Sequence, residues 1–230
     1  MRTFLIAVGA SMVLAIPANA ATRNFGVTDF TKIRVDAPFK VVLATGVAPF
    51  AKASGSSAAL DRVDLEMRGD TLIVRTASSW GGYPNDNAGP VEVSIGTHEL
   101  NSALLNGGGS LLIDRVHGLS FALTVQGSGR AEIGSAEIDQ MSVGLAGSGS
   151  ARIAGRAKQL TSVVRGIATL DAGRLAVTDA TIGAEGAATI EATVTGSAAV
   201  DATGPATIRL AGRPACKLKV AGSTDVSGCK

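Results

Sequence analysis

The residue types that most often carry chemistry are scarce in this chain. Histidine occurs only at His98 and His117, and cysteine only at Cys216 and Cys229. A zinc site would need further histidine, cysteine or carboxylate ligands at useful spacing, and each histidine stands alone at the edge of a predicted strand. We therefore predict no metal site and no cofactor.

Hydrolytic chemistry would need an activated serine or a pair of carboxylates. Ser128 and Ser148 each lie directly between two glycines, which is typical of a turn and not of a nucleophile elbow. Asp114 and Asp171 follow equivalent apolar positions of the repeat described below. The same position in other copies holds Gly134, Ala154, Glu191 and Arg209. We therefore predict no stacked acidic cluster and no catalytic residue.

Two aromatic residues are the strongest local candidates for ligand binding. Trp80 and Tyr83 lie in a glycine- and asparagine-containing insertion between residues 77 and 90. Rings on a protruding loop are common in recognition, whereas a single Trp in a ring-poor protein is often recruited to a core. Both readings stay open: a binding loop, or a plug at one end of the fold.

The tripeptide Arg68-Gly69-Asp70 matches an integrin-recognition motif, but its glycine is also explained by a turn.

The element that positions these residues is a repeat of about twenty residues. Seven-residue segments that end in glycine recur with apolar or small residues six, four and two positions before that glycine, Ser162 being the exception. Alternation at period two predicts strands, and a fixed spacing of 18 to 20 residues predicts stacked coils. We expect one inward-facing column of side chains. Its members are Leu123, Val143, Ile182, Val200 and Leu218.

The recurring glycines predict the corners of the coil, where a positive φ or a close backbone approach excludes a Cβ. A second apolar residue follows each glycine, six positions on at Ile113, Ile133 and Ile153 but four positions on at Leu170 and its later counterparts. We interpret this change as a corner that shortens by two residues along the chain.

The fold class predicted is all-β: a single-domain parallel β-helix, or solenoid, with about 18–20 residues per coil. Regular coils span 101–230, and 25–100 form a less regular, β-rich N-terminal cap. Within this cap, residues 63–74 fit either another coil or a hairpin that turns at Gly69 and Asp70.

Residues 1–20 have the layout of a signal peptide. Arg2 precedes an apolar run from Phe4 to Ile16, and Ala18-Asn19-Ala20 supplies small residues at a cleavage site. The domain after cleavage near Ala20 is then 21–230, without a predicted membrane span and either periplasmic or secreted to the cell surface. In an oxidising compartment we expect Cys216 and Cys229 to form a disulfide.

The charge of the chain excludes one class of partner. The formal charge of +2 falls to +1 when Arg2 is removed with the signal segment, and no run of Lys or Arg occurs. We therefore predict no nucleic-acid binding.

The chain resembles the family called putative auto-transporter adhesin, head GIN domain. The resemblance lies in residues 30–43, in 65–74, in the Gly-Ser-Gly corners and in the final Gly-Ser-Thr-Asp-Val-Ser-Gly-Cys. It implies a secreted, right-handed β-solenoid with a role in adhesion, and it carries over no catalytic residue. An auto-transporter needs a C-terminal membrane barrel of alternating strands, and we do not expect one within this sequence, whose repeat is barely finished at Lys230.

Three functional hypotheses follow. The first is an exported, non-enzymatic, adhesin-like or envelope interaction protein that binds an unidentified cell-envelope or extracellular protein or glycan. The alternative is a carbohydrate-active enzyme, a polysaccharide lyase or hydrolase on a β-helix scaffold. The third is a structural envelope protein without a discrete ligand.

Overall fold

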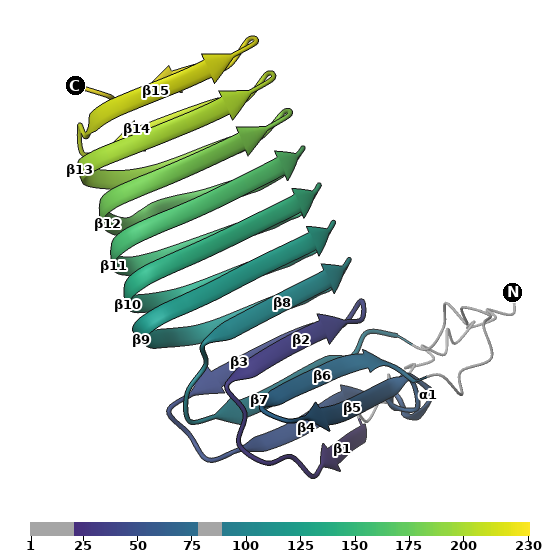
Figure 1. Cartoon of the computed structure of the whole chain (residues 1–230). Helices are drawn as coiled ribbons and strands as arrows, with labels where there is room; N and C mark the ends of the chain where they lie inside the picture. Colours follow the sequence, from purple (N-terminus) through teal and green to yellow (C-terminus); the bar gives the residue numbers. More distant parts are fainter. Residues whose placement is uncertain (1–20, 78–88) are drawn as a thin grey trace, which may run out of the picture.

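The chain folds as a β-solenoid standing on a β-rich cap (Figure 1). The computed structural model describes residues 21–77 and 89–230. The signal-peptide segment lies outside these residues. No helix in the described ranges is long and apolar enough to cross a membrane.

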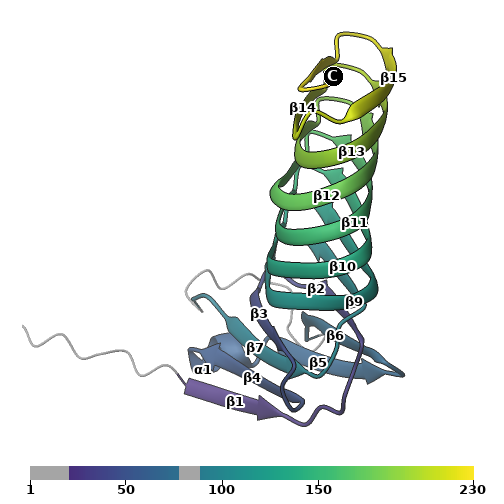
Figure 2. The same ribbon diagram turned by 90° about the vertical axis from the view of Figure 1, so that its left-hand side faces the viewer.

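Five long, bent strands form the body of the solenoid. They are β9 (Ser110–Gly127), β10 (Arg130–Gly147), β11 (Ser150–Gly166), β12 (Thr169–Glu185) and β13 (Thr189–Thr203). Each long strand runs along one sheet, curves round an arc and returns along the other sheet, as Figure 2 shows from the side of the arcs. The stack ends in β14 (Thr207–Ala211), β15 (Ala215–Ala221) and β16 (Asp225–Ser227).

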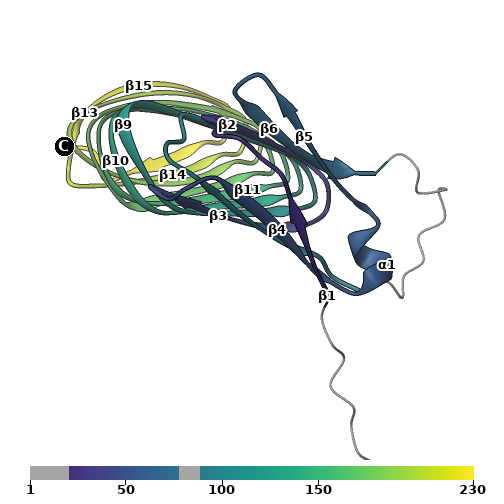
Figure 3. The same ribbon diagram turned by 90° about the horizontal axis from the view of Figure 1, so that it is seen from below.

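Successive coils pair in parallel, as the repeat predicted. Ile133 lies opposite Ile113 on one side and Ile153 on the other, so neighbouring coils are offset by 20 residues here. The offset falls to 18 residues between β13 and β14, where Ile190 lies opposite Ile208. The predicted fold class and coil length are therefore confirmed. Seen along the stack, the coils superimpose as a flattened oval (Figure 3).

The inward column is confirmed for four of its five predicted members. Leu123, Val143, Ile182 and Val200 are each at most 2% exposed. Leu218 lies in register with Val200 but is 48% exposed, so its predicted burial is wrong. The reason is position: β15 belongs to the last coil, and in the described part of the chain no further coil covers it. Ser162 occupies the same column and is buried.

The corner glycines have the predicted backbone conformation. From Gly107 to Gly222, the seven corner glycines of the repeat have φ between 89° and 109°. A Cβ added to Gly147 would lie 2.6 Å from the carbonyl oxygen of Gly127 in the preceding coil. Glycine is therefore required by conformation and by space.

The predicted shortening of the corner is wrong. Leu170 lies opposite Ala151, two residues before Ile153, so the corner keeps its length from β11 to β12. What changes is the order of large and small side chains along one strand. Ala151 and Ile153 both point inward in β11, as do Leu170 and Ala172 in β12. Each of these coils thus places one large and one small side chain in the core.

The cap continues both sheets below the first long strand. Its elements are β1 (Ala21–Phe25), β2 (Lys32–Asp36), β3 (Lys40–Thr45), β4 (Phe50–Gly55), α1 (Ser57–Leu60), β5 (Val63–Arg68), β6 (Thr71–Thr76), β7 (Glu92–Thr97) and β8 (Ser102–Gly107). Strands β2 and β3 pair in parallel with β8 and β9 and so extend the coil. Strands β4 and β1 add antiparallel edges to one sheet, and the antiparallel hairpin β5–β6 ends the other. Residues 63–74 are therefore a hairpin.

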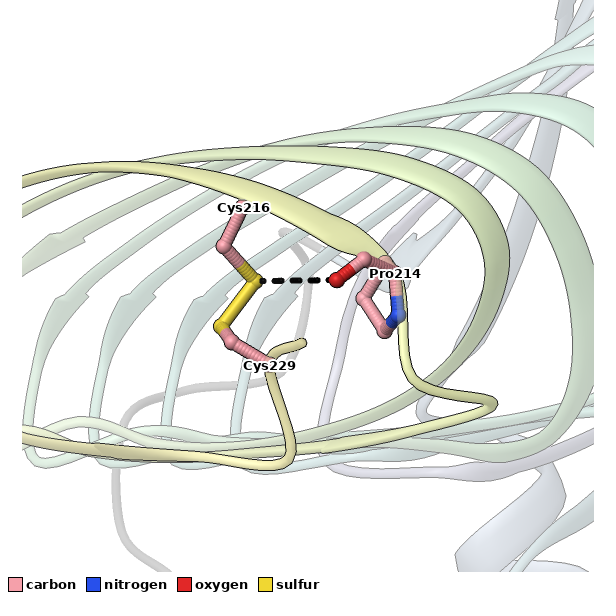
Figure 4. Close-up of a disulfide and its surroundings, with 3 residues drawn as sticks. All are labelled: Pro214, Cys216 and Cys229. Atoms are coloured by element: carbon pink, nitrogen blue, oxygen red, sulfur yellow. Dashed lines mark hydrogen bonds between the residues drawn. A yellow bond between two sulfur atoms is a disulfide. The ribbon is translucent and has the colours of Figure 1, made fainter.

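A disulfide closes the last coil (Figure 4). Cys216 on β15 is bonded to Cys229, and their Cα atoms are 5.6 Å apart. The predicted pairing is confirmed. The bond links the two sheets at the end of the stack, where fewer neighbouring strands hold the chain.

Candidate binding surface

The two sheets present different chemistry to solvent. We call front sheet the one formed by β5, β6, β2, β8, the second halves of β9–β13, and β15; it faces the viewer in Figure 1. The back sheet contains β1, β4, β7, β3, the first halves of β9–β13, β14 and β16.

Charged residues pair with each other between coils on the back sheet, on the arcs and at the border and upper end of the front sheet, where Arg165 contacts Glu185 and Lys219 contacts Asp201, each at 3.0 Å. Arg152 on β11 contacts Asp171 on β12 at 2.9 Å, and Arg209 on β14 contacts Glu191 on β13 at 3.4 Å. On the arcs, Arg156 lies 2.8 Å from Glu137 in the preceding coil. These exposed pairs contribute little stability individually, but they leave fewer charges free for a partner.

The front sheet contains a broad area without any charge. It covers four successive coils, namely residues 101–106, 120–126, 140–146 and 159–164, and none of these residues is Asp, Glu, Lys, Arg or His. We call its outward surface the uncharged face. Its outward residues are Asn101, Ser102, Leu104, Asn106, Ser120, Ala122, Thr124, Gln126, Gln140, Ser142, Gly144, Ala146, Gln159, Thr161 and Val163.

The uncharged face contains a shallow groove of about 280 Å³, which we call the amide groove. Its polar lining is Asn101, Ser120, Gln140, Ser142, Gln159 and Thr161. Phe121, Ala122 and Met141 complete it, and the Phe121 ring and the Met141 thioether are almost fully buried. All six polar residues are exposed, and their side chains make no hydrogen bond to another group within residues 21–77 and 89–230.

The register places these groups in columns. Gln140 lies opposite Ser120 and Gln159, and Ser142 lies opposite Thr161. Neighbouring strands are about 4.8 Å apart, and alternate residues of one strand are about 6.8 Å apart. The amide groove therefore offers donors and acceptors on a regular grid.

Asp114 and Asp171, the two acidic residues at equivalent positions of the repeat, are both hydrogen-bonded within the protein. Arg152 donates a hydrogen bond to Asp171 and holds the pKa of that carboxyl below its usual value of 3.8. A general acid needs a raised pKa instead. Asp114 accepts hydrogen bonds from the backbone N–H of Thr45 and of Arg115, at 3.0 and 2.6 Å. Both carboxylates therefore act as structural partners.

The histidines lie on different elements of the fold. His98 follows β7 in the cap, with Nδ1 3.1 Å from a carboxylate oxygen of Asp29. Thr97 donates a hydrogen bond to Asp29 and thereby lowers the pKa of that carboxyl. His117 lies on the arc of β9, opposite Glu137. In the described ranges, no group of three or more His, Cys, Asp or Glu residues is arranged to hold a metal ion.

The Arg68-Gly69-Asp70 tripeptide forms the turn of the β5–β6 hairpin. Gly69 has a φ of 61°, Arg68 pairs with Glu66 at 2.6 Å, and Asp70 pairs with Lys32 at 3.1 Å. Both charged groups are thus engaged within the protein, which supports the turn interpretation. Trp80 and Tyr83 lie outside the described residues, so their predicted role in binding stays a prediction.

The uncharged face is the feature that sequence reasoning missed. Its signal was present in the sequence: four segments that align in the repeat carry amides and hydroxyls but no charge. The signal becomes visible only when the segments are written one above another in register.

Solved structures similar to this chain share its fold. One, described as a putative adhesin from Bacteroides fragilis, has a TM-score of 0.81 and 19% identity, with 91% of this chain and 95% of that chain covered. Another, described as a putative lipid binding protein from Parabacteroides distasonis, has a TM-score of 0.71 and 20% identity over 91% and 96% of the two chains. A putative adhesin from Parabacteroides merdae has a TM-score of 0.61 and 17% identity, with coverage of 91% and 96%.

No match was found among curated proteins. A family profile does match, over residues 29–214, and so covers most of the solenoid and its cap. The chain therefore belongs to the family described as putative auto-transporter adhesin, head GIN domain.

Proposed function

We propose that this protein is an exported, non-enzymatic, adhesin-like interaction protein and that it binds its partner through the uncharged face. The partner is a macromolecule of the cell envelope or the extracellular space. The description of the family and of similar structures as adhesins supports this class of function.

The observation that carries the proposal is the contrast between the surfaces. On the back sheet and the arcs, charges are matched by pairs such as Arg152–Asp171 and Arg156–Glu137. On the uncharged face, the six exposed amides and hydroxyls of the amide groove have no partner in the described part of the chain, whereas Asn106, outside the groove, donates a hydrogen bond to Asp36 at 3.3 Å. A partner can therefore replace water at these groups without breaking any contact within the protein.

The geometry of a solenoid supports the same conclusion. Each coil contributes one row to the surface, so the face is flat, extended and held by the ladder hydrogen bonds beneath it. A rigid surface loses little conformational entropy when it binds. This suits attachment to an extended partner better than the enclosure of a small molecule.

Placing charge on each sheet in turn tests the proposal. The front variant combines Ser142→Glu and Thr161→Glu, and the matched control combines Ser150→Glu and Thr169→Glu on the back sheet. All four residues point outward from the long strands. Binding of the labelled protein to intact bacterial cells and to their extracellular polymers is measured by flow cytometry.

We expect the front variant to lose binding and the control to bind as the unmodified protein does. Buried unpaired charge at an interface is costly, so the loss should be about tenfold or more. Equal binding by the front variant, or equal loss in both variants at unchanged melting temperature, would refute the proposal. Absence of binding by the unmodified protein would refute it as well.

A further inference from the structure

We propose that the amide groove is a binding site for a neutral polysaccharide. This inference rests on the proposed function and goes beyond it, because it names both the ligand class and the residues that contact the ligand. The site consists of Asn101, Ser120, Gln140, Ser142, Gln159 and Thr161 around a depression of about 280 Å³.

The chemistry of the lining selects a neutral ligand rich in hydroxyl groups. A side-chain amide offers two N–H donors and one carbonyl acceptor, and a Ser or Thr hydroxyl both donates and accepts. Sugar hydroxyls are likewise donors and acceptors, so either group can pair with them. The four aligned segments contain no charged residue, and an anionic or cationic polymer would therefore lose hydration without gaining an ion pair.

The groove also supplies the apolar surface that sugar rings need. Ala122 lies in the column of Ser142 and Thr161, next to the column of Gln140 and Gln159, and it is partly exposed above the buried Phe121 and Met141. The C–H groups of a sugar ring can lie against Ala122 while its hydroxyls reach the amides of the neighbouring column. No aromatic ring is presented on the surface of the groove, because Phe121 is 1% exposed. Hydrogen bonds therefore carry recognition.

The shape of the site favours a polymer over a single sugar. Ser120, Gln140 and Gln159 belong to three successive strands, and Asn101 belongs to the segment below them. Four strands at a spacing of about 4.8 Å span about 14 Å along the solenoid. The site can contact several consecutive sugar units, and each unit adds a weak contribution.

A protein partner fits the groove less well. The cores of protein interfaces are rich in aromatic, Met and Arg side chains, and hot spots are enriched in Trp, Tyr and Arg. The outward residues of the uncharged face are small or carry amides, apart from the half-buried Leu104 and from Val163, which is 37% exposed. A peptide cannot add as a strand either, because both edges of β9, β10 and β11 are already paired.

Affinity electrophoresis in native gels containing a soluble polysaccharide tests the inference. The neutral probes are dextran, galactomannan and xyloglucan, and the charged probes are polygalacturonate and heparin. The variant Gln140→Ala with Gln159→Ala removes two amides from the groove and keeps it neutral. The control Gln126→Ala removes an exposed amide from the same face outside the groove.

We expect at least one neutral polymer, and neither charged polymer, to retard the unmodified protein. The double variant should bind about tenfold more weakly or worse, since two hydrogen bonds are lost, and the control should bind normally. Short oligosaccharides of the same polymer should bind far more weakly than the polymer.

The inference is overturned if no neutral polymer retards the protein, if only charged polymers do, or if the double variant binds normally. Its failure can be told apart from failure of the proposed function. If the front charge variant abolishes binding to cells while no polysaccharide is bound, the face is an interaction surface and its ligand is not a neutral glycan.

Discussion

Ser162 is a defect in an otherwise apolar column, and its replacement is expected to stabilise the protein. Its side chain lies between Val143 and Ile182 of the neighbouring coils, and the residue is 1% exposed. Its hydroxyl oxygen is buried without a hydrogen-bond partner in the described part of the chain. A buried hydroxyl that pairs with nothing costs about 1–3 kcal/mol.

Ser162→Val should therefore raise the free energy of unfolding by about 1–3 kcal/mol. The neighbouring coil holds a valine at the equivalent position of this column, because Val143 lies opposite Ser162 and is 2% exposed. Ser162→Ala separates the effect of removing the unpaired hydroxyl from the effect of adding apolar volume, because it removes the hydroxyl without adding volume. The reverse change, Val143→Ser, creates the same defect in the next coil and should destabilise by about 2–4 kcal/mol.

Urea denaturation followed by circular dichroism measures these differences. The midpoint should rise for Ser162→Val and fall for Val143→Ser, with an unchanged denaturant slope. Hydrogen exchange along β11 gives a local measure if coils open separately. A loss of more than about 1 kcal/mol in Ser162→Val would refute the reasoning, because it would mean that the hydroxyl is paired or that the column is too narrow for valine.

Three further predictions concern the last coil, the charges and the corners. Replacing Cys216 and Cys229 by Ser should lower the free energy of unfolding by about 3 kcal/mol by the chain-entropy estimate. The melting temperature should fall, and hydrogen exchange should become faster in β15 than in β11. Unchanged exchange in β15 would contradict this prediction. Arg152 lowers the pKa of Asp171 from 3.8, so the Asp171 carboxylate stabilises the fold above about pH 4, and this contribution is lost as the pH falls through the folded-state pKa. In the variant Asp171→Asn, the urea midpoint should therefore fall less steeply between about pH 5 and 3 than in the unmodified protein. An equally steep fall would count against the pairing. Gly147→Ala should lower the free energy of unfolding by at least about 1–3 kcal/mol, because φ is 109° and the new Cβ would meet a carbonyl of the preceding corner. A thermal melt like that of the unmodified protein would contradict the corner geometry.

The repeat could be predicted because alternation and corner glycines are local properties of the chain. Val143 and its neighbours had to face inward once the period was known, and Gly147 had to adopt a positive φ. The burial of Leu218 could not be predicted correctly, because its local pattern is the same as that of Val200 and only the number of coils above it differs.

Register and function depend on relations between coils. Leu170 and Ile153 look equivalent in sequence, yet pairing places Leu170 opposite Ala151, since either of two inward positions can hold the large side chain. The uncharged face likewise exists only across strands: Gln140 and Gln159 are ordinary surface residues until the ladder sets them side by side. Pairs such as Arg152–Asp171 arise from the same register and could be identified only with it.

The central claim is that binding belongs to one face of the solenoid, and a scan with single glutamates tests it most directly. The scan places Glu at one outward hydroxyl per coil on each sheet and measures the dissociation constant for cells or for the neutral polymer that binds. The front positions are Thr124, Ser142, Thr161 and Thr181, and the back positions are Ser110, Ser150, Thr169 and Thr189. Binding should weaken most at Ser142 and Thr161, less at the outer front positions, and not at all on the back. Losses spread equally over both sheets in folded variants, or confined to the back sheet, would contradict the account.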